Sequence, residues 1–250
     1  MVPISLDGPI VEYRETGDTF KILPELLKTV IKRHSSRVVY ELGAGANPLL
    51  SLDYIGQGAI DYRIFDISAE ELAKAPKGYQ TQVMDVTLPS NGALHDSADF
   101  IFSKWTVEHI ANPRQFHENV TQMLREGGIA LHHFPTLYAP PYLLNKLLPD
   151  AISNVLLMML QKGRERHGAQ GKFPAYYRWC RGPLAIQFRR FESVGFRVLK
   201  YIGTFGHHPY YDKIPVMRRA HAALATHLAS HPCPLLTSFA YVVLQKDPKR

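Results

Sequence analysis

Cysteine and long apolar runs are both scarce in this chain. The two cysteines, Cys180 and Cys233, are too few for a disulfide framework, and such low usage is consistent with a reducing compartment. The most apolar stretch, residues 151–160, is bounded by Asp150 and Lys162 and is far shorter than the ~20 residues that span a bilayer. The first 30 residues lack a charged start followed by an apolar run, so we expect no signal peptide and a cytoplasmic location.

Acidic residues are fewer than basic ones: 22 Asp and Glu stand against 29 Lys and Arg, which gives a net charge of +7. This balance permits an anionic partner such as nucleic acid, a phospholipid surface or a phosphorylated substrate. The charges are spread along the chain, so a solvated basic surface explains them equally well. With 250 residues and 46% hydrophobic content, the chain can bury a single large core, and its composition excludes collagen-like, coiled-coil and disordered proteins.

Short β-branched and aromatic runs alternate with helix-like segments. The alternation predicts right-handed βαβ units, hence an α/β doubly wound and mostly parallel sheet of about seven strands. The predicted strands are 37–42, 62–66, 80–84, 99–103, 129–134, 196–202 and 237–244. The predicted helices are 18–34, a helix from about residue 48, 68–75, 113–124, 183–193 and about 213–230.

The pattern suggests one domain, 1–250, with three additions. Residues 1–36 form an N-terminal helical extension, and 205–234 a second helical insertion. Residues 136–182 interrupt the alternation with two apolar stretches, a basic segment and an aromatic run, and we expect them to cap the site. The stretch 142–172 could instead make a peripheral contact with the inner face of an anionic membrane, and both interpretations stay open.

Unusual side chains gather where the predicted strands end. Parallel sheets bind ligands beyond the carboxyl ends of their strands, and the glycine-containing turn 41–47, Asp66 and Asp85 all lie at such ends. Glycines in a strand-to-helix turn let the backbone approach a ligand closely. Pro48 stands where a dinucleotide-binding turn has its third glycine, which argues against a pyrophosphate ligand.

These motifs resemble class I S-adenosylmethionine-dependent methyltransferases of the small-molecule type 11 and type 23 group. The resemblance is carried by VVYELGAGAN, by Asp66, by the pair Met84-Asp85 and above all by residues 98–135, and it covers roughly residues 35–136. It implies a Rossmann-like sheet whose last strand is antiparallel, with helical lid insertions. It also implies S-adenosylmethionine as cofactor and S-adenosylhomocysteine (SAH) as product.

The resemblance further implies contacts for the first two strand ends. Gly43 and Gly45 would face the ribose and methionine parts of the cofactor, and Glu41 would orient the methionine ammonium. Asp66 would bind the ribose hydroxyls, and Ile67 beside it is also expected at the cofactor.

The next two strand ends complete the implied cofactor site. Asp85 would bind the exocyclic amine of adenine, while Met84 and Val86 would pack on the ring. Ser103 and Lys104 would line the methionine side through their backbone.

Candidate residues for the acceptor side are histidines, aromatic residues and a basic residue. His132 and His133 end the fifth predicted strand on opposite faces, and either one could accept a hydroxyl proton because histidine titrates near neutrality. Further substrate candidates are Glu108, His109, Tyr176, Arg178 and His207. In some related quinone O-methyltransferases a glutamate precedes the Glu-His pair to complete a metal site, but Trp105 stands there, so we expect no metal.

The predicted activity is methyl transfer to a small-molecule acceptor, preferably to oxygen, by in-line displacement. The acceptor could be anionic or lipid-linked. Three alternatives stay open: a cofactor-binding protein without turnover, an NAD(P)-dependent oxidoreductase, and a nucleic-acid methyltransferase. The last is disfavoured because SKWT occupies residues 103–106, where an Asp/Asn-Pro-Pro-Tyr tetrapeptide would be expected. The acceptor's identity and the oligomeric state do not follow from the sequence.

Overall fold

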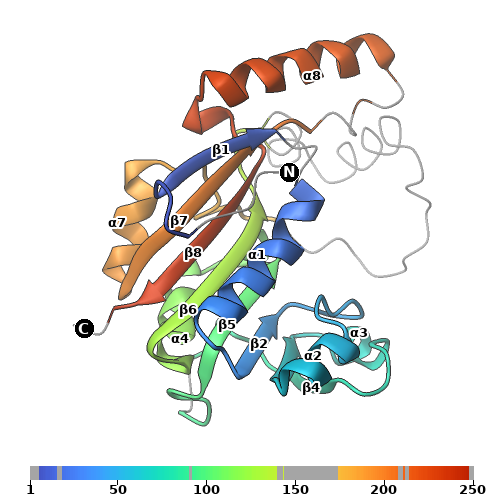
Figure 1. Ribbon diagram of the computed structural model, residues 1–250, viewed down its shortest axis with the longest axis vertical. Helices are drawn as coiled ribbons and strands as arrows, with labels where there is room; N and C mark the ends of the chain where they lie inside the picture. The colour runs from blue at the N-terminus through green and yellow to red at the C-terminus, as the bar shows by residue number, and fades with distance from the viewer. Residues whose placement is uncertain are drawn as a thin grey trace.

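The computed structural model shows one twisted sheet of eight strands with helices on both faces (Figure 1). It describes residues 6–15, 19–89, 92–139, 143, 174–207, 211 and 214–247. The strand order is β1-β7-β8-β6-β5-β2-β3-β4. Among these strands only β8 runs antiparallel to its neighbours, β6 and β7. The predicted α/β sheet with an antiparallel last strand is therefore confirmed.

The bounds of most elements lie within a few residues of the prediction. The strands are β1 Val11–Glu15, β2 Val38–Leu42, β3 Asp61–Asp66, β4 Gln80–Val83, β5 Ala98–Lys104, β6 Leu124–Pro135, β7 Phe196–Phe205 and β8 Phe239–Lys246. The α-helices are α1 Thr19–Arg33, α2 Leu52–Gly58, α3 Ala69–Ala73, α4 Pro113–Met123, α7 Ala185–Ser193 and α8 Pro215–Ser230. Two short 3-10 helices are η2 Val107–His109 and η4 Pro234–Leu236.

Alternate residues of the central strands serve two separate cores. Ile101 and Ala130 point to the core that contains α4 and α7, whereas Phe100, Phe102 and Leu131 point to the core that contains α1. Both faces of the sheet are apolar because parallel strands with helices on each side are buried on both faces. Figure 1 shows α1 crossing one face of the sheet while α4 and α7 lie on the other.

Two features differ from the sequence-based expectation. The N-terminal extension contains a strand as well as a helix, because β1 pairs in parallel with β7 from Val11↔Tyr201 to Glu15↔Phe205. Helix α2 begins at Leu52 rather than near Pro48, with Ser51 as its N-cap. The six residues from Ala46 to Ser51 are therefore irregular and separate the glycine turn from the helix.

Most of the expected cap, residues 136–182, lies outside the described residues, as does all but one residue of 142–172. Its described residues are 136–139, 143 and 174–182. The last of these stretches returns along η2 to the sheet: the backbone N–H groups of Tyr176 and Tyr177 donate to the carbonyl of Glu108 at 2.7 and 3.1 Å. No helix in the described part of the chain combines the length and apolar character that a bilayer crossing requires.

Candidate functional site

The glycine turn after β2 is joined to the ends of β3 and β5. The N–H of Gly43 donates to the carbonyl of Phe65 at 2.7 Å, and the N–H of Gly45 donates to Oδ2 of Asp66 at 2.9 Å. Both glycines have positive φ, +72° and +50°. A Cβ at Gly43 would overlap the side chain of Thr106, whereas a Cβ at Gly45 would meet its nearest neighbour at 3.4 Å. The turn therefore needs glycine at position 43 for space as well as for conformation.

Asp66 and Asp85 lie at adjacent strand ends. The Oδ1 atom of Asp66 accepts from the N–H of Ser68 at 2.9 Å, so its carboxylate holds both the glycine turn and the start of α3. The Oδ1 atom of Asp85 accepts two bonds from Thr87, at 2.8 and 2.7 Å. Ile67 follows Asp66 with 59% of its surface exposed. Together these residues present two carboxylates and an apolar side chain at one edge of the sheet.

Glu41 is buried and has a structural role. Its Oε2 atom accepts from the N–H of Leu49 at 3.0 Å and from the hydroxyl of Tyr62. Burial raises the pKa of Glu41 to about 7, and these two bonds counteract the rise. The side chain therefore fixes the irregular segment before α2.

Met84, Val86 and Ser103 lie on the face of the sheet that carries α4. Met84 and Val86 are partly buried against that core. Ser103 is fully buried, and its Oγ lies 2.8 Å from Nδ1 of His132. Any contact of Ser103 with a ligand at the strand ends is thus through its backbone.

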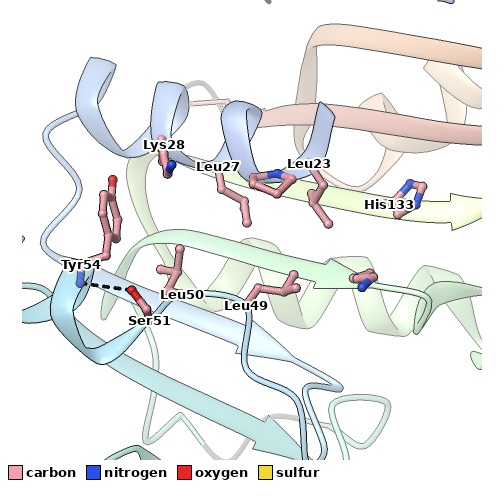
Figure 2. A pocket seen from close by; sticks show the side chains of 10 residues that line it. Leu23, Leu27, Lys28, Leu49, Leu50, Ser51, Tyr54 and His133 are labelled. Carbon is pink, nitrogen blue, oxygen red and sulfur yellow. Dashed lines mark hydrogen bonds between the residues drawn. The ribbon is translucent and has the colours of Figure 1, made fainter. Parts of the chain in front are cut away.

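A cavity of about 290 Å³ opens on the other face, between α1 and the segment that leads into α2. Figure 2 shows Leu23 and Leu27 of α1 facing Leu49 and Leu50 across it. At one end lie Lys28 and Tyr54, and at the other His133 (Figure 2). The described residues that line it are Leu23, Pro24, Leu27, Lys28, Leu49, Leu50, Ser51, Tyr54, Lys104 and His133.

Of the two candidate histidines, only His133 lines this cavity. Its Nδ1 lies 3.2 Å from the carbonyl of Ala240, which can only accept, so Nδ1 carries the proton and Nε2 keeps its lone pair. The ring stacks on Tyr241 with centroids 4.1 Å apart. Burial, together with the charge of Lys104, lowers the pKa of His133 to about 3. His133 is therefore neutral at physiological pH.

His132 is not placed to act on a substrate in this cavity, so its assignment as a candidate base is corrected. As predicted, His132 and His133 lie on opposite faces of β6, but the face that carries His132 is as apolar as the face that carries His133. His132 is fully buried there, beside Phe116 and His117, and its Nε2 has no hydrogen-bond partner. Burial and the neighbouring His117 hold the pKa of His132 well below its usual range.

Directly after β5 lies Trp105, which the sequence indicated only as the residue in place of a metal-ligating glutamate and not as part of the site. Trp105 has φ of +53°, in the left-handed region that non-glycine residues seldom adopt, and its N–H donates to the carbonyl of His133 at 2.8 Å. The ammonium of Lys104 lies 4.5 Å from the centre of the Trp105 ring. Unusual backbone of this kind concentrates at functional sites.

The remaining acceptor candidates divide into two groups. Glu108, His109, Tyr176 and Arg178 lie together around η2: Nδ1 of His109 is 3.0 Å from the carbonyl of Pro174, and the guanidinium of Arg178 lies 6.0 Å from the centre of the Tyr176 ring. Glu108 itself is buried without a partner for Oε2, and burial raises its pKa to about 8.

His207 lies elsewhere, beyond the end of β7. Its Nδ1 is 2.9 Å from Oγ of Ser238, its Nε2 is 3.2 Å from the hydroxyl of Tyr211, and its N–H donates to Nε2 of His221 in α8 at 2.9 Å. These bonds anchor α8 to the sheet. In the described residues, no three His, Cys, Asp or Glu side chains converge where a metal ion could be held.

Comparisons with known proteins agree with this geometry. Residues 41–132 match the family model described as a methyltransferase domain. That range begins at Glu41 before the glycine turn and ends at His132 in β6. A search of curated proteins found no match.

Solved structures share the fold at low sequence identity. A candidate sarcosine dimethylglycine methyltransferase from Galdieria sulphuraria has a TM-score of 0.55 and 10% identity, over 94% of this chain and 88% of that one. A SAM-dependent methyltransferase from Archaeoglobus fulgidus has a TM-score of 0.51 and 14% identity, over 92% of this chain and 97% of that one. The trans-methyltransferase CalH, solved in complex with SAH, has a TM-score of 0.54 and 14% identity, over 89% of this chain and 55% of that one. The fold is that of the class I SAM-dependent methyltransferases, and residues 41–132 match a methyltransferase domain.

Proposed function

We propose that this protein transfers a methyl group from S-adenosylmethionine to an oxygen of a small-molecule acceptor. The observation that carries the proposal is the set of strand ends at one edge of the sheet: the glycine turn is bonded to Asp66 there, and Lys104 at the end of β5 lines the cavity together with His133. The methyltransferase family match indicates S-adenosylmethionine as the cofactor. When bound, it supplies a methyl group on a sulfonium that is already activated.

The residues at the sheet edge fit this cofactor. Carboxylate oxygens accept hydrogen bonds, so Asp66 suits ribose hydroxyls and Asp85 suits the exocyclic amine of adenine. Gly45 adds no side chain of its own to the turn, although a Cβ there would lie 3.4 Å from Cβ of Glu71 and 3.6 Å from Oδ2 of Asp66. A nicotinamide dinucleotide fits less well: a pyrophosphate binds at a helix N-terminus directly after the glycines, but α2 begins only at Leu52.

In this proposal the chain aligns the reactants, and alignment alone can lower a barrier by several kcal/mol, up to ~7–11 in the best model systems. The bound cofactor would supply its methyl group to the acceptor oxygen and leave as S-adenosylhomocysteine, and the part of this chain would be to hold the two reactants in line. His133 takes the hydroxyl proton at Nε2. Although burial makes His133 a weak base, the hydroxyl becomes strongly acidic as its oxygen acquires the methyl group. The positive charge of Lys104 favours loss of the proton from the hydroxyl, although it also lowers the pKa of His133, which receives the proton.

Ligand-dependent thermal melts test the cofactor assignment. A ligand at ~100 times its Kd stabilises by ~2.7 kcal/mol, which is a shift of several degrees at this chain length. We expect SAH and S-adenosylmethionine to produce this shift, and Asp66→Ala and Asp85→Ala to abolish it. The exposed-site variant Glu126→Ala should keep it.

Three results would count against the proposal. Stabilisation by NAD or NADP alone would replace it with an oxidoreductase. Binding of SAH without methyl transfer to any acceptor would favour a protein that keeps the cofactor and lacks turnover. No response to any of the four ligands would remove the cofactor assignment.

A further inference from the structure

The cavity between α1 and the start of α2 has the size and lining of a site for one small organic molecule. Its volume of about 290 Å³ lies at the lower end of the ligand-site range of roughly 300–1,000 Å³. Leu23, Leu27 and Leu50 are nearly fully buried around it, and Leu49 is partly buried. The middle of the cavity therefore suits an apolar body, such as an aromatic ring or a short alkyl chain.

Polar groups occupy the two ends of the cavity, and they differ in kind. At the inner end, Lys104 and His133 lie near the carboxyl ends of β5 and β6. At the outer end, Lys28 and Tyr54 lie on opposite sides of the opening (Figure 2). Among the described residues, no acidic side chain lines the cavity.

The outer end has the chemistry of a carboxylate site. Lys28 provides an ammonium, and Ser51 and Tyr54 provide hydroxyl groups. The Oγ atom of Ser51 accepts from the N–H of Tyr54 at 3.3 Å, which leaves its own proton to donate. The ammonium of Lys28 lies 3.7 Å from Oε1 of Glu25, and both side chains are more than half exposed. So exposed an ion pair is weak and can yield to a ligand.

We propose that the methyl acceptor is a small hydroxy acid with an apolar body. Its carboxylate binds at Lys28, Ser51 and Tyr54, its body lies between the leucines of α1 and the segment before α2, and its hydroxyl lies at Lys104 and His133. This assignment rests on the proposed function for the role of the hydroxyl, but the binding of an apolar anion in the cavity can be measured without any cofactor.

The test compares a matched pair of probes. 3-(4-Hydroxyphenyl)propanoate and the neutral 3-(4-hydroxyphenyl)propan-1-ol share their phenol and ring and differ only in the charged end. Titration calorimetry on the whole protein should show the acid binding about ten-fold more tightly, since a charged hydrogen-bond partner is worth about that much. Lys28→Glu should abolish the preference and leave the affinity for the alcohol unchanged.

Two further variants make the result specific to the cavity. Lys32→Glu makes the same charge change on an exposed position of α1 that does not line the cavity, so the ten-fold preference should persist. Leu27→Trp fills the apolar middle and should weaken both probes. Equal binding of acid and alcohol to the wild type, no binding of either, or a Lys32→Glu effect equal to that of Lys28→Glu would overturn the inference.

Failure of the inference can be told apart from failure of the proposed function. SAH binding is measured by thermal melts on wild type and Lys28→Glu, and it should be the same in both. If SAH fails to bind while the acid still does, the cofactor assignment falls and the anion site stands. If SAH displaces the acid competitively, the cavity belongs to the cofactor and the inference is overturned.

Discussion

Replacing Glu108 with glutamine should make the protein less sensitive to alkaline pH. Glu108 lies in η2 with Oε2 buried and unpartnered, and burial raises its pKa from 4.5 to about 8. Since the fold favours the protonated acid, the resulting stabilisation is fully present below pH 4.5 and is lost as pH rises through 8. Glutamine has nearly the same shape and does not titrate.

The size of the effect follows from the two pKa values. Between pH 6 and pH 9 the wild type should lose about 2.5 kcal/mol of unfolding free energy relative to Glu108→Gln. For a chain of this length that difference corresponds to roughly 5–10 °C in Tm. Other buried titratable groups are the same in both proteins, so their contributions cancel to first order.

The assay is urea denaturation of wild type and Glu108→Gln at pH 6, 7, 8 and 9. The exposed-site variant Glu126→Gln is the matched control and should follow the wild type at every pH. A constant difference between Glu108→Gln and wild type across this range would refute the reasoning, because it would mean that Glu108 is ionised in the fold or has the same pKa when unfolded.

Three further substitutions have calculable outcomes. Gly43→Ala should lower the free energy of unfolding, measured by urea denaturation, by roughly 2–4 kcal/mol, because a positive φ and an overlap with Thr106 act together. Gly45→Ala should lower it by only about 1 kcal/mol, because that position has the positive φ without the overlap. Equal losses in the two variants would contradict this account. His133, whose folded pKa is about 3 instead of 6.5, stabilises the fold above pH 6.5 and loses that contribution as pH falls. From pH 7.5 to 5.5 the wild type should therefore lose about 1.3 kcal/mol more than His133→Gln, and parallel curves would show that His133 is accessible to protons.

Most of the sheet could be predicted because its signal is local. Each run such as residues 99–103 is β-branched or aromatic and is followed by a helix-length segment, so strand and helix positions are encoded within about 20 residues. Strand β1 was missed because Glu12 and Arg14 interrupt its apolar pattern, and its partner β7 lies about 190 residues away. The late start of α2 was missed because Leu49 and Leu50 look like the first turn of a helix, although in the fold they line the cavity.

The candidate site was also predicted only in part, and again the predictable part is the one encoded locally in the sequence. The glycine turn, Asp66 and Asp85 could be predicted because parallel strands bring their carboxyl ends to one edge. The cavity could not, because it depends on how α1 packs: the spacing of Leu23 and Leu27 predicts only a buried face, and Lys28 has the pattern of a surface residue. The alternation of His132 and His133 was correct, but the face that contains a cavity is set by the packing of whole helices.

The pairing of β1 with β7 also constrains the order in which the chain can fold. Lys200 in β7 is buried, and its ammonium contacts Oε2 of Glu12 at 2.7 Å and the carbonyl of Pro9 at 3.0 Å. During synthesis, β1 therefore leaves the ribosome about 190 residues before its partner β7. Until β1 docks, Lys200 lacks the carboxylate of Glu12 and the outer edge of β7 is unpaired.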